Sequence, residues 1–255
     1  MSKFRTERLL YRNITVGKKD ELLASVEGLL GIGGAVATVN PIMLYDAMKD
    51  CELAQALDNS VCIPDGIGIC IALSKRGVHT EVFPGVELCE ALLDAQALDK
   101  GVTFAIIGGR EGVADGARDY LLSRHKFAEC LFTVSGYGYS EEDLAKKIKE
   151  AEPDMVLVCL GSPKQEILIS KFLKIAPRTL YLGLGGSLDV YSGRIKRAPK
   201  VFRRLKAEWL WRMIREPRRL SGIPKILNFA TLCRMERRLG EGSSMSKHTK
   251  KPKKH

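Results

Sequence analysis

The chain has 255 residues, of which 45% are hydrophobic and 28% are charged. This length and composition are typical of a globular protein with one large domain, or one domain and an appendage. They argue against a membrane-spanning helix, because no apolar run approaches the roughly 20 residues that such a helix needs. The N-terminal stretch MSKFRTERLLYRN also lacks the hydrophobic segment of an export signal.

The net charge of +11 is distributed unevenly along the chain. Residues 194–255 contain 20 Lys and Arg against 4 Asp and Glu, whereas residues 1–193 contain 21 against 26. This asymmetry predicts a polyanionic partner for the C-terminal quarter: nucleic acid, an anionic membrane or a phosphorylated substrate. The seven cysteines form no C-x-x-C pair, which favours buried thiols in a reducing cytoplasm over disulfides or a zinc site.

Apolar, β-rich runs alternate with helical patterns from residue 35 to residue 186. The expected strands are AVATVN (35–40), VCIP (61–64), VTFAIIGG (102–109), LFTVSGYG (131–138), MVLVCLGS (155–162) and TLYLGLGG (179–186). The expected helices cover residues 41–58, 66–77, 85–101, 110–125, 141–154 and 163–175. Continuous apolar strands separated by helices predict an α/β fold with a mostly parallel, doubly wound sheet.

Four predicted strands are followed directly by turns of glycine or small polar residues, TVNP, IPDGIG, IIGGREG and CLGSPKQE. Parallel strands place these turns at one sheet edge, where open α/β sheets bind their ligands. That edge would carry Thr38, Asn40, Asp65, Gly108, Gly109, Gly112, Gln165 and Glu166. Glycine turns that open helices suit phosphate, because they present free N–H groups at the positive end of the helix dipole. Tight packing of strand on helix explains the glycines as well.

Asp65 stands between Pro64 and Gly66, which predicts a sharp turn at the end of a strand. An aspartate there can act as a general base or can bond its own backbone. The chain has no D-x-D, P-loop, H-E-x-x-H or G-x-S-x-G motif, and two of its four histidines lie in the C-terminal tail. These are too few parts for a metal cage or a Ser-His-Asp triad. If the protein is an enzyme, Asp65 is therefore the best-placed base.

Gln165 and Glu166 are expected in the first turn of a helix that Pro163 opens. An amide at this place can bind a sugar hydroxyl or a phosphate, so Gln165 is a candidate ligand-binding residue. For Glu166 we favour a role limited to complementing the helix dipole. The GGREG turn lacks the full dinucleotide fingerprint and is weak evidence for a nicotinamide cofactor.

The charge pattern divides the chain into an α/β body (1–193), a basic helical appendage (194–239) and a disordered basic tail (240–255). In the appendage, Pro217 is expected to end a first helix. One apolar face of that helix would hold Leu205, Trp209, Met213 and Ile214, beside Arg203, Arg204, Lys206 and Arg212. A second amphipathic segment would hold Ile223, Ile226, Leu227, Ala230 and Met235. Such faces fit a helix lying on an anionic membrane, or helices that pack on the body with solvated charges.

Together these motifs make the chain resemble the WecG/TagA/CpsF glycosyltransferases of bacterial envelope polymer synthesis. The resemblance covers roughly residues 14–220, in the order of the family. The matching stretches are TVNPIMLYDA, PDGIGI, PGVELCEALL, FAIIGGREGVADGA, LVCLGSPKQE, YLGLGGSLDVYSGRIKRAP and AEWLWRMIREPRRL.

The resemblance implies a Rossmann-like fold with a C-terminal helical appendage. It also implies a metal-independent, cofactor-free transfer that inverts the anomeric centre. An N-acetylmannosamine-type sugar would pass from a UDP-sugar donor to a polyprenyl-diphosphate-linked N-acetylglucosamine, in cell-envelope polysaccharide or teichoic acid synthesis. The enzyme would work in the cytoplasm as a peripheral protein, on the inner face of the plasma membrane, with residues 194–239 on the anionic surface.

Carried over to this sequence, the resemblance makes Asp65 the general base and places Thr38, Asn40 and Gln165 in the same catalytic pocket. The substrate-binding residues that it implies are Gly108, Gly109, Tyr137, Gln165, Gly185, Gly186, Asp189, Arg197, Arg212 and Arg219. Arg212 and Arg219 would reach the diphosphate, a task that suits guanidinium groups. Val82 stands where members of the family often have arginine, so one expected charge contact is in doubt.

Two other functions remain open at this stage. A nucleic-acid-binding α/β protein would explain the basic C-terminal quarter, but it would not explain why Asn40, Asp65 and Gln165 gather at one sheet edge. A nucleotide-sugar sensor without turnover would use the same edge for binding alone. Self-association into a homo-oligomer is compatible with either function.

Overall fold

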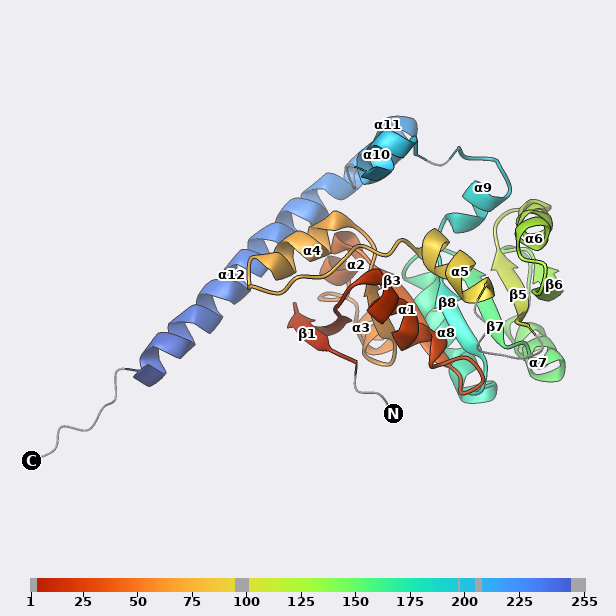
Figure 1. The fold of residues 1–255 in the computed structure, drawn as a ribbon, viewed down its shortest axis with the longest axis horizontal. Helices are drawn as coiled ribbons and strands as arrows, with labels where there is room; N and C mark the ends of the chain where they lie inside the picture. The colour runs from red at the N-terminus through yellow and green to blue at the C-terminus, as the bar shows by residue number, and fades with distance from the viewer. Residues whose placement is uncertain (1–3, 95–100, 197, 205–207, 249–255) are drawn as a thin grey trace, which may run out of the picture.

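The computed structural model describes residues 4–94, 101–196, 198–204 and 208–248 (Figure 1). Its main sheet has six strands in the order β4-β3-β8-β7-β5-β6, and every neighbouring pair is parallel. The strands are β3 (Gly34–Val39), β4 (Val61–Pro64), β5 (Thr103–Gly108), β6 (Glu129–Val134), β7 (Met155–Cys159) and β8 (Leu180–Gly183). The predicted α/β fold with a parallel sheet is confirmed.

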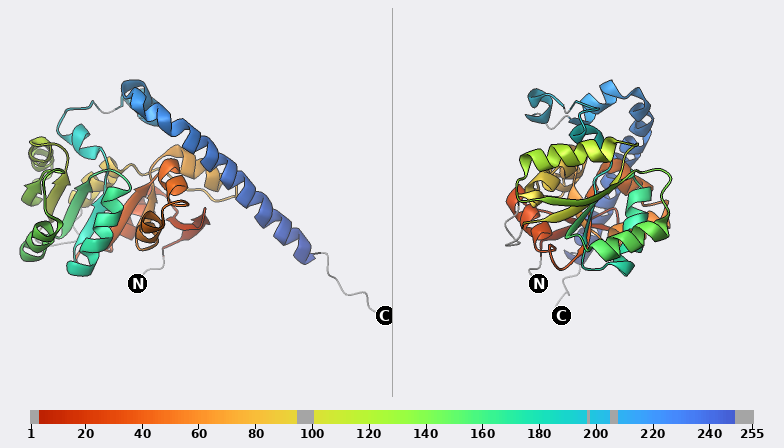
Figure 2. Two further views of the ribbon diagram at one scale, coloured as in Figure 1. Left: turned by 180° about the vertical axis from the view of Figure 1, so that it is seen from behind. Right: turned by 90° about the vertical axis from the view of Figure 1, so that its right-hand side faces the viewer.

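Helices cover both faces of this sheet, as the two views of Figure 2 show. The helices of the body are α1 (Lys19–Glu27), α2 (Pro41–Asp46), α3 (Cys51–Asp58), α4 (Ile67–Ser74), α5 (Gly85–Leu93), α6 (Val113–Arg124), α7 (Glu141–Ala151), α8 (Lys164–Ile175) and α9 (Ser187–Tyr191). The hydrophobic clusters divide them into two layers. Helices α1, α5, α6 and α9 contribute to the core on one face, and α2, α3, α4, α7 and α8 to the cores on the other.

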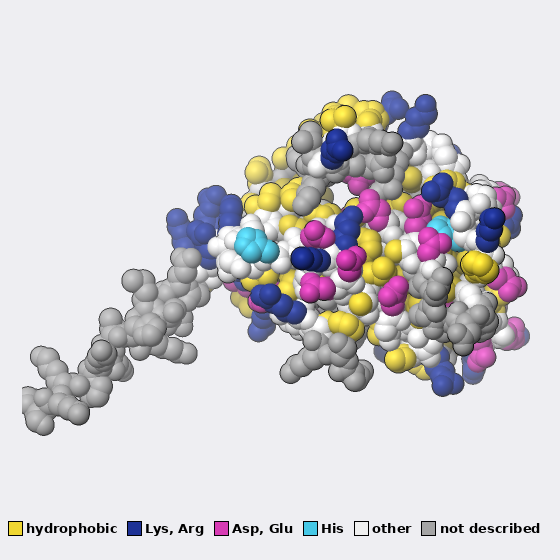
Figure 3. All heavy atoms as spheres, viewed as in Figure 1, with side chains coloured by type: hydrophobic (Ala, Val, Ile, Leu, Met, Phe, Trp, Pro, Cys, Tyr) yellow, Lys and Arg dark blue, Asp and Glu magenta, His cyan; other side chains and the backbone are white. Residues whose placement is uncertain are grey.

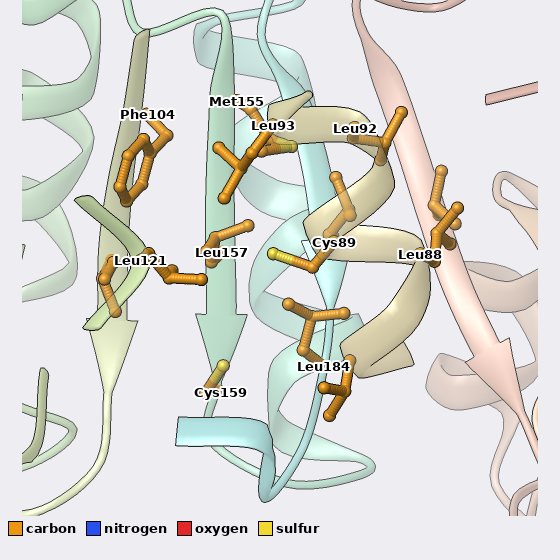
Figure 4. Close-up of a cluster of buried hydrophobic side chains, with 14 of the residues drawn as sticks. Leu88, Cys89, Leu92, Leu93, Phe104, Leu121, Met155, Leu157, Cys159 and Leu184 are labelled. Carbon is orange, nitrogen blue, oxygen red and sulfur yellow. The ribbon is translucent and has the colours of Figure 1, made fainter. Parts of the chain in front are cut away.

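The strands are apolar throughout because both faces of the sheet are covered. In β7, Leu157 and Cys159 face the layer of α5, where Figure 4 shows them beside Cys89. The alternating residues Val156 and Val158 join the opposite cluster with α7 and α8. Burying each aliphatic side chain of this kind stabilises the fold by roughly 1.5–3 kcal/mol.

The helix expected over residues 41–58 is two helices, α2 and α3, and this prediction was wrong in one respect. Asp50 separates them, because its side chain accepts hydrogen bonds from the backbone N–H groups of Glu52 and Leu53, both at 3.0 Å. An aspartate that caps a new helix in this way competes with continuation of the preceding one.

The structure also contains a two-stranded antiparallel hairpin of β1 (Thr6–Leu9) and β2 (Arg12–Thr15), which was not predicted, and neither was α1. The hairpin turns at Leu10 and Tyr11, whose φ angles are 45° and 67°. This left-handed conformation is the one that two-residue hairpin loops require. Residues in this conformation are usually glycine or asparagine. Neither is present here, so the turn could not be recognised from the sequence.

The C-terminal part contains α10 (Lys200–Arg204), α11 (Glu208–Arg215), the 3-10 helix η1 (Pro217–Gly222) and the long α12 (Ile223–His248). As predicted, the helix before Pro217 ends at Arg215. The boundary expected at residue 240 falls inside α12, so helical structure continues past the position where the chain was expected to become disordered. Figures 1 and 2 show α12 running along the body and extending beyond it.

Helix α12 packs on the body through one of its faces. Phe229 and Cys233 are 3% and 7% exposed, in the hydrophobic cluster that also contains Leu9 and Leu10 of the hairpin. Lys225 forms an ion pair with Asp46 of α2 at 2.7 Å. The face of α12 that contacts the body was not predicted, because Phe229 and Cys233 are not among the apolar residues that the sequence pattern assigned to this segment.

The outer face of α12 carries several of those predicted apolar residues, with Leu227 63% and Met235 55% exposed, whereas Ile226 is half-buried. In α11, Met213 is buried and Ile214 is 60% exposed, so these two residues do not share one environment as predicted. Leu205 and Lys206 lie outside the described residues. The side chains of Arg203, Trp209 and Arg212 are not described.

Candidate active site

The carboxyl ends of all six strands meet at one edge of the sheet, and the predicted site residues follow this edge in strand order. Asp65 follows β4, Thr38 and Asn40 lie at the end of β3, and Gly185 follows β8. Gln165 lies beyond β7, Gly108 and Gly109 end β5, and Tyr137 follows β6. With strands about 4.8 Å apart, the six strands span roughly 24 Å, so these residues cannot all contact one sugar.

The connections after the central strands diverge to opposite faces of the sheet. The chain leaves β8 for α9, which packs with α5 and α6. It leaves the neighbouring strands β3 and β7 for α2 and α8, which pack on the other face. In open α/β sheets, ligands bind where neighbouring connections part in this way. The end of β8 is therefore the centre of the candidate site.

Asp65 lies in the turn beside the end of β3. Its backbone N–H donates to the carbonyl of Val39 at 2.8 Å, which extends the pairing of β3 and β4 by one residue. The side chain is half-buried. The next residue, Gly66, has a φ of 122°, and nothing lies within 4 Å of the place where a Cβ would stand. The predicted sharp turn is confirmed, and its backbone faces open space next to the carboxylate.

Asn40 acts as the N-cap of α2. Its Oδ1 accepts the backbone N–H groups of Ile42 at 3.0 Å and Met43 at 3.1 Å. This is the usual work of an asparagine that follows a strand and opens a helix. If Asn40 contacts a ligand directly, the contact is therefore made by the NH₂ group of its amide.

Thr38 is 7% exposed and donates its hydroxyl to the carbonyl of Gly183 at 3.1 Å. It also lies against α5, because a Cβ on Gly85 would stand 3.2 Å from the Thr38 Oγ1 and 3.1 Å from Leu184. Thr38 thus connects β3, β8 and the start of α5. Gly85 and Gly183 were not singled out in the sequence, although glycine inside a strand or at a helix start often marks such a close approach.

Gln165 and Glu166 open α8 and are 2% and 3% exposed. The Gln165 Oε1 accepts the backbone N–H of Gly161 at 3.2 Å and that of Gly185 at 2.9 Å. Its Nε2 donates to Glu166 Oε1 at 2.7 Å. The expected role of Glu166, limited to the helix dipole, leaves out this buried contact. Burial raises the pKa of Glu166, while hydrogen bonds from Gln165 and Ser162 act in the opposite direction.

At the far end of the edge, Gly108 and Gly109 are required by packing. A Cβ on Gly108 would stand 2.3 Å from the carbonyl oxygen of Cys159, and one on Gly109 would stand 2.8 Å from Val113. The Gly109 carbonyl accepts the N–H of Gly136 at 2.8 Å, which brings this turn beside Tyr137. Tyr137 is 71% exposed. The structure therefore brings Gly108, Gly109 and Tyr137 together at the β5–β6 end, whereas Gly185 and Gly186, expected near the same ligand, follow β8.

The remaining predicted residues lie around α9 and in the appendage. Gly186 is exposed and Asp189 is half-buried in the first turn of α9. Arg197 lies outside the described residues. Arg212 belongs to α11 and Arg219 to η1, but their side chains are not described. Their approach to the sheet edge thus stays a prediction.

The loop that carries Val82 runs beside Asp65. Phe83, the residue after Val82, donates its backbone N–H to the carbonyl of Pro64 at 2.9 Å. The position at which the sequence departs from the resembled family thus adjoins the candidate base. Among the described residues, no group of three or more His, Cys, Asp and Glu side chains could hold a metal ion.

Comparisons with known proteins identify the family of the chain. Residues 8–242 match the sequence profile of the Glycosyl transferase WecG/TagA/CpsF family. An N-acetylglucosaminyldiphosphoundecaprenol N-acetyl-beta-D-mannosaminyltransferase of Bacillus subtilis (strain 168) is 34% identical over 200 residues, covering 76% of this chain and 77% of the relative. The Bacillus spizizenii protein of the same name is 33% identical over 202 residues, with the same coverage. The chain is a glycosyltransferase of the WecG/TagA/CpsF family.

Proposed function

We propose that the protein transfers an N-acetylmannosamine-type sugar from UDP to N-acetylglucosamine carried on a polyprenyl diphosphate, with inversion at the anomeric carbon. The relatives from Bacillus are named for this acceptor and this sugar. The observation that carries the proposal is the half-buried Asp65 in a turn at the carboxyl edge of the sheet, beside Asn40 and the open face of Gly66. The edge provides the base that such a transfer needs.

In this mechanism Asp65 accepts the proton of the attacking hydroxyl of the acceptor sugar. The hydroxyl oxygen forms the new bond to the anomeric carbon, while the bond from that carbon to the UDP oxygen breaks and UDP leaves with the electron pair. Attack from the side opposite to UDP inverts the centre. Thr38 supports the reaction indirectly, because its bond to the Gly183 carbonyl holds β3 against β8.

The departing diphosphate needs positive charge or hydrogen-bond donors. The N-termini of α5, α6 and α8 all lie at the carboxyl edge and provide the positive ends of helix dipoles. Gly112, which precedes α6, and Gly161, which precedes α8, both face open space. Arg212 and Arg219 would add guanidinium groups from the appendage. We propose that these groups neutralise the UDP without a metal ion.

We also propose that the appendage holds the enzyme at the inner face of the plasma membrane, where a lipid-linked acceptor would be found. No helix in the described part of the chain has the length and apolar character needed to cross a bilayer. The outer face of α12 instead combines exposed Leu227 and Met235 with exposed Arg234 and Arg238. Figure 3 shows hydrophobic side chains along the upper edge of the molecule and basic ones where α12 leaves the body.

The membrane proposal is tested with vesicles of anionic and neutral lipid. Binding of the full chain should increase with anionic lipid and decrease with salt. Replacing Leu227 and Met235 together by Gln should weaken it, because both side chains are more than half exposed. Phe127→Gln is the control, since Phe127 is 85% exposed on the opposite end of the body. Equal loss in both variants would contradict a role for the α12 face.

The transfer itself is tested by measuring UDP release from a panel of UDP-sugars, with and without lipid-linked N-acetylglucosamine. Release that depends on both the N-acetylmannosamine donor and the acceptor is expected. UDP-sugar binding with no turnover on any acceptor would instead favour a nucleotide-sugar sensor.

A further inference from the structure

Glu166 is a buried acid at the centre of the candidate site, and the transfer mechanism above does not use it. It is 3% exposed, and its Oε2 has no hydrogen-bond partner among the described residues. Its neighbour Gln165 and its own Oε1 lie over the α-carbon of Gly183 at the end of β8. A Cβ on Gly183 would stand 3.0 Å from Gln165 Nε2 and 3.4 Å from Glu166 Oε1.

The contacts of Gln165 permit only one orientation of its amide. The carbonyl oxygen accepts two backbone N–H groups, from Gly161 after β7 and from Gly185 after β8. A rotated amide would turn its NH₂ group toward these two donors and lose both bonds. The Nε2 must therefore point to Glu166, whose Oε1 is the acceptor at 2.7 Å. Glu166 completes a bridge between two turns of the sheet edge.

The two turns that this bridge joins have their free sides open. Gly161 and Gly185 have φ angles of 78° and 54°, and nothing lies within 4 Å of the place where a Cβ would stand on either. The backbone there is accessible to a ligand that approaches closely. The bridge from Gln165 thus fixes the spacing of two exposed turns beneath the central part of the site.

We propose that Glu166 is a positioning residue for the glycosyl transfer. Its carboxyl accepts the hydrogen bond that fixes the orientation of the Gln165 amide. The fixed amide in turn holds the Gly161 and Gly185 turns at the spacing that the donor substrate needs. This inference rests on the proposed function. It assigns Glu166 no contact with substrate. Burial raises the pKa of Glu166, and the groups that act against burial are the Gln165 amide, the Ser162 hydroxyl and its own backbone N–H.

The first test compares Glu166→Leu with Glu166→Gln in the full chain. Leucine fills similar space but cannot accept the Gln165 N–H, whereas glutamine keeps a neutral acceptor oxygen. We expect Glu166→Leu to reduce kcat/KM by roughly 10-fold to 100-fold through misplacement of the turns, and Glu166→Gln to stay within about threefold of wild type. In a Gln165→Ala background, the Glu166→Leu change should add little, because the residue it acts through is gone. Equal loss in both Glu166 variants, or additive losses in the double variant, would overturn the proposal.

The second test does not depend on activity. Hydrogen exchange at the Gly161 and Gly185 amides should accelerate at least several-fold in Glu166→Leu and should stay at the wild-type rate in Glu166→Gln. The Gly136 amide, which donates to Gly109 at the other end of the edge, is the internal control. Unchanged exchange at Gly161 and Gly185 in a folded Glu166→Leu protein would overturn the bridge. The expected exchange pattern in a protein that transfers no sugar would instead contradict the proposed function alone.

Discussion

Two parts of the same sheet edge use their polar side chains in different ways. At the β7–β8 turns, Gln165 and Glu166 are 2% and 3% exposed and bond only to protein groups in the described contacts. At the β3–β4 turns, Asp65 is half-buried beside the open face of Gly66. Position at a strand end therefore does not by itself assign a role. The two parts differ in exposure, and we propose that the substrate reacts at the more exposed one.

The largest effect should come from Asp65, at the reactive part. Asp65→Asn should reduce turnover by roughly 10²–10⁴-fold, equivalent to about 2.7–5.5 kcal/mol in the barrier, because the amide cannot accept the proton. Binding of UDP and the unfolding midpoint should stay near wild type. Asp119→Asn is a matched control, since Asp119 is exposed on α6. Near-normal turnover of Asp65→Asn would remove Asp65 from the mechanism.

Variants of Asn40 test whether this residue supports the structure alone or also contacts the substrate. Asn40→Ala removes the cap of α2 and should lower the free energy of unfolding by about 0.5–2 kcal/mol. Asn40→Ser keeps a capping oxygen, so it should restore most of that stability. If the Asn40 amide also contacts substrate, Asn40→Ser will remain slow in UDP release. Full recovery of both stability and activity would show that Asn40 only caps the helix.

A smaller effect is expected from the pH dependence of unfolding, followed by urea titration from pH 4 to about pH 9. The pKa of Glu166 is raised from 4.5 in the folded protein, so the folded state holds this proton more tightly than the unfolded chain does. The stability due to Glu166 is thus present in full below 4.5 and is lost as pH rises through the folded pKa. Glu166→Gln does not titrate, so its stability relative to wild type should increase with pH.

Glu142 provides a control of opposite sign for that experiment. The pKa of this exposed carboxyl is lowered, first by its own backbone N–H and then by Ser140. Glu142→Gln should therefore be slightly less stable than wild type, with the difference fully present above the ordinary value of 4.5 and lost as pH falls through the lowered pKa. If Glu166→Gln and Glu142→Gln follow the same trend with pH, the pKa of Glu166 is not raised in the folded protein.

No effect at all is expected from chelation. UDP release in EDTA should equal that in Mg²⁺, because helix N-termini and arginines are proposed to neutralise the diphosphate. Activity that EDTA abolishes and Mn²⁺ or Mg²⁺ restores would show that a cation takes part in the reaction at this edge.

The sequence predicted the sheet and the common edge at which the candidate residues lie, because both depend on local patterns. Continuous apolar runs such as VTFAIIGG can only be covered strands, and strand ends followed by Pro, Gly or Asn mark one edge. The break between α2 and α3 was detectable from Asp50, whose capping role was overlooked. The hairpin was not detectable, because Leu10 and Tyr11 are unusual residues for its left-handed turn.

Long-range contacts account for what sequence patterns could not give at the site and in the appendage. The first-turn position of Glu166 suggested a role limited to the helix dipole, and nothing in the sequence indicated that Glu166 is buried near Gly183. In α12 the pattern emphasised Leu227 and Met235, which face outward, while Phe229 and Cys233 form the contact with the body. Two apolar stripes on one helix cannot be assigned to solvent or core without the partner surface.

The contact between α12 and the hairpin also dictates when the fold can be completed during synthesis. The Leu10 N–H donates to the Glu236 carboxylate at 3.1 Å, across 226 residues of chain. Arg76 pairs with the same carboxylate and donates to the carbonyl of Arg8. The hairpin is therefore synthesised well before the helix that covers it. Until α12 is made, the part of the apolar cluster that Phe229 closes lacks its cover, and exposed apolar surface of this kind favours aggregation.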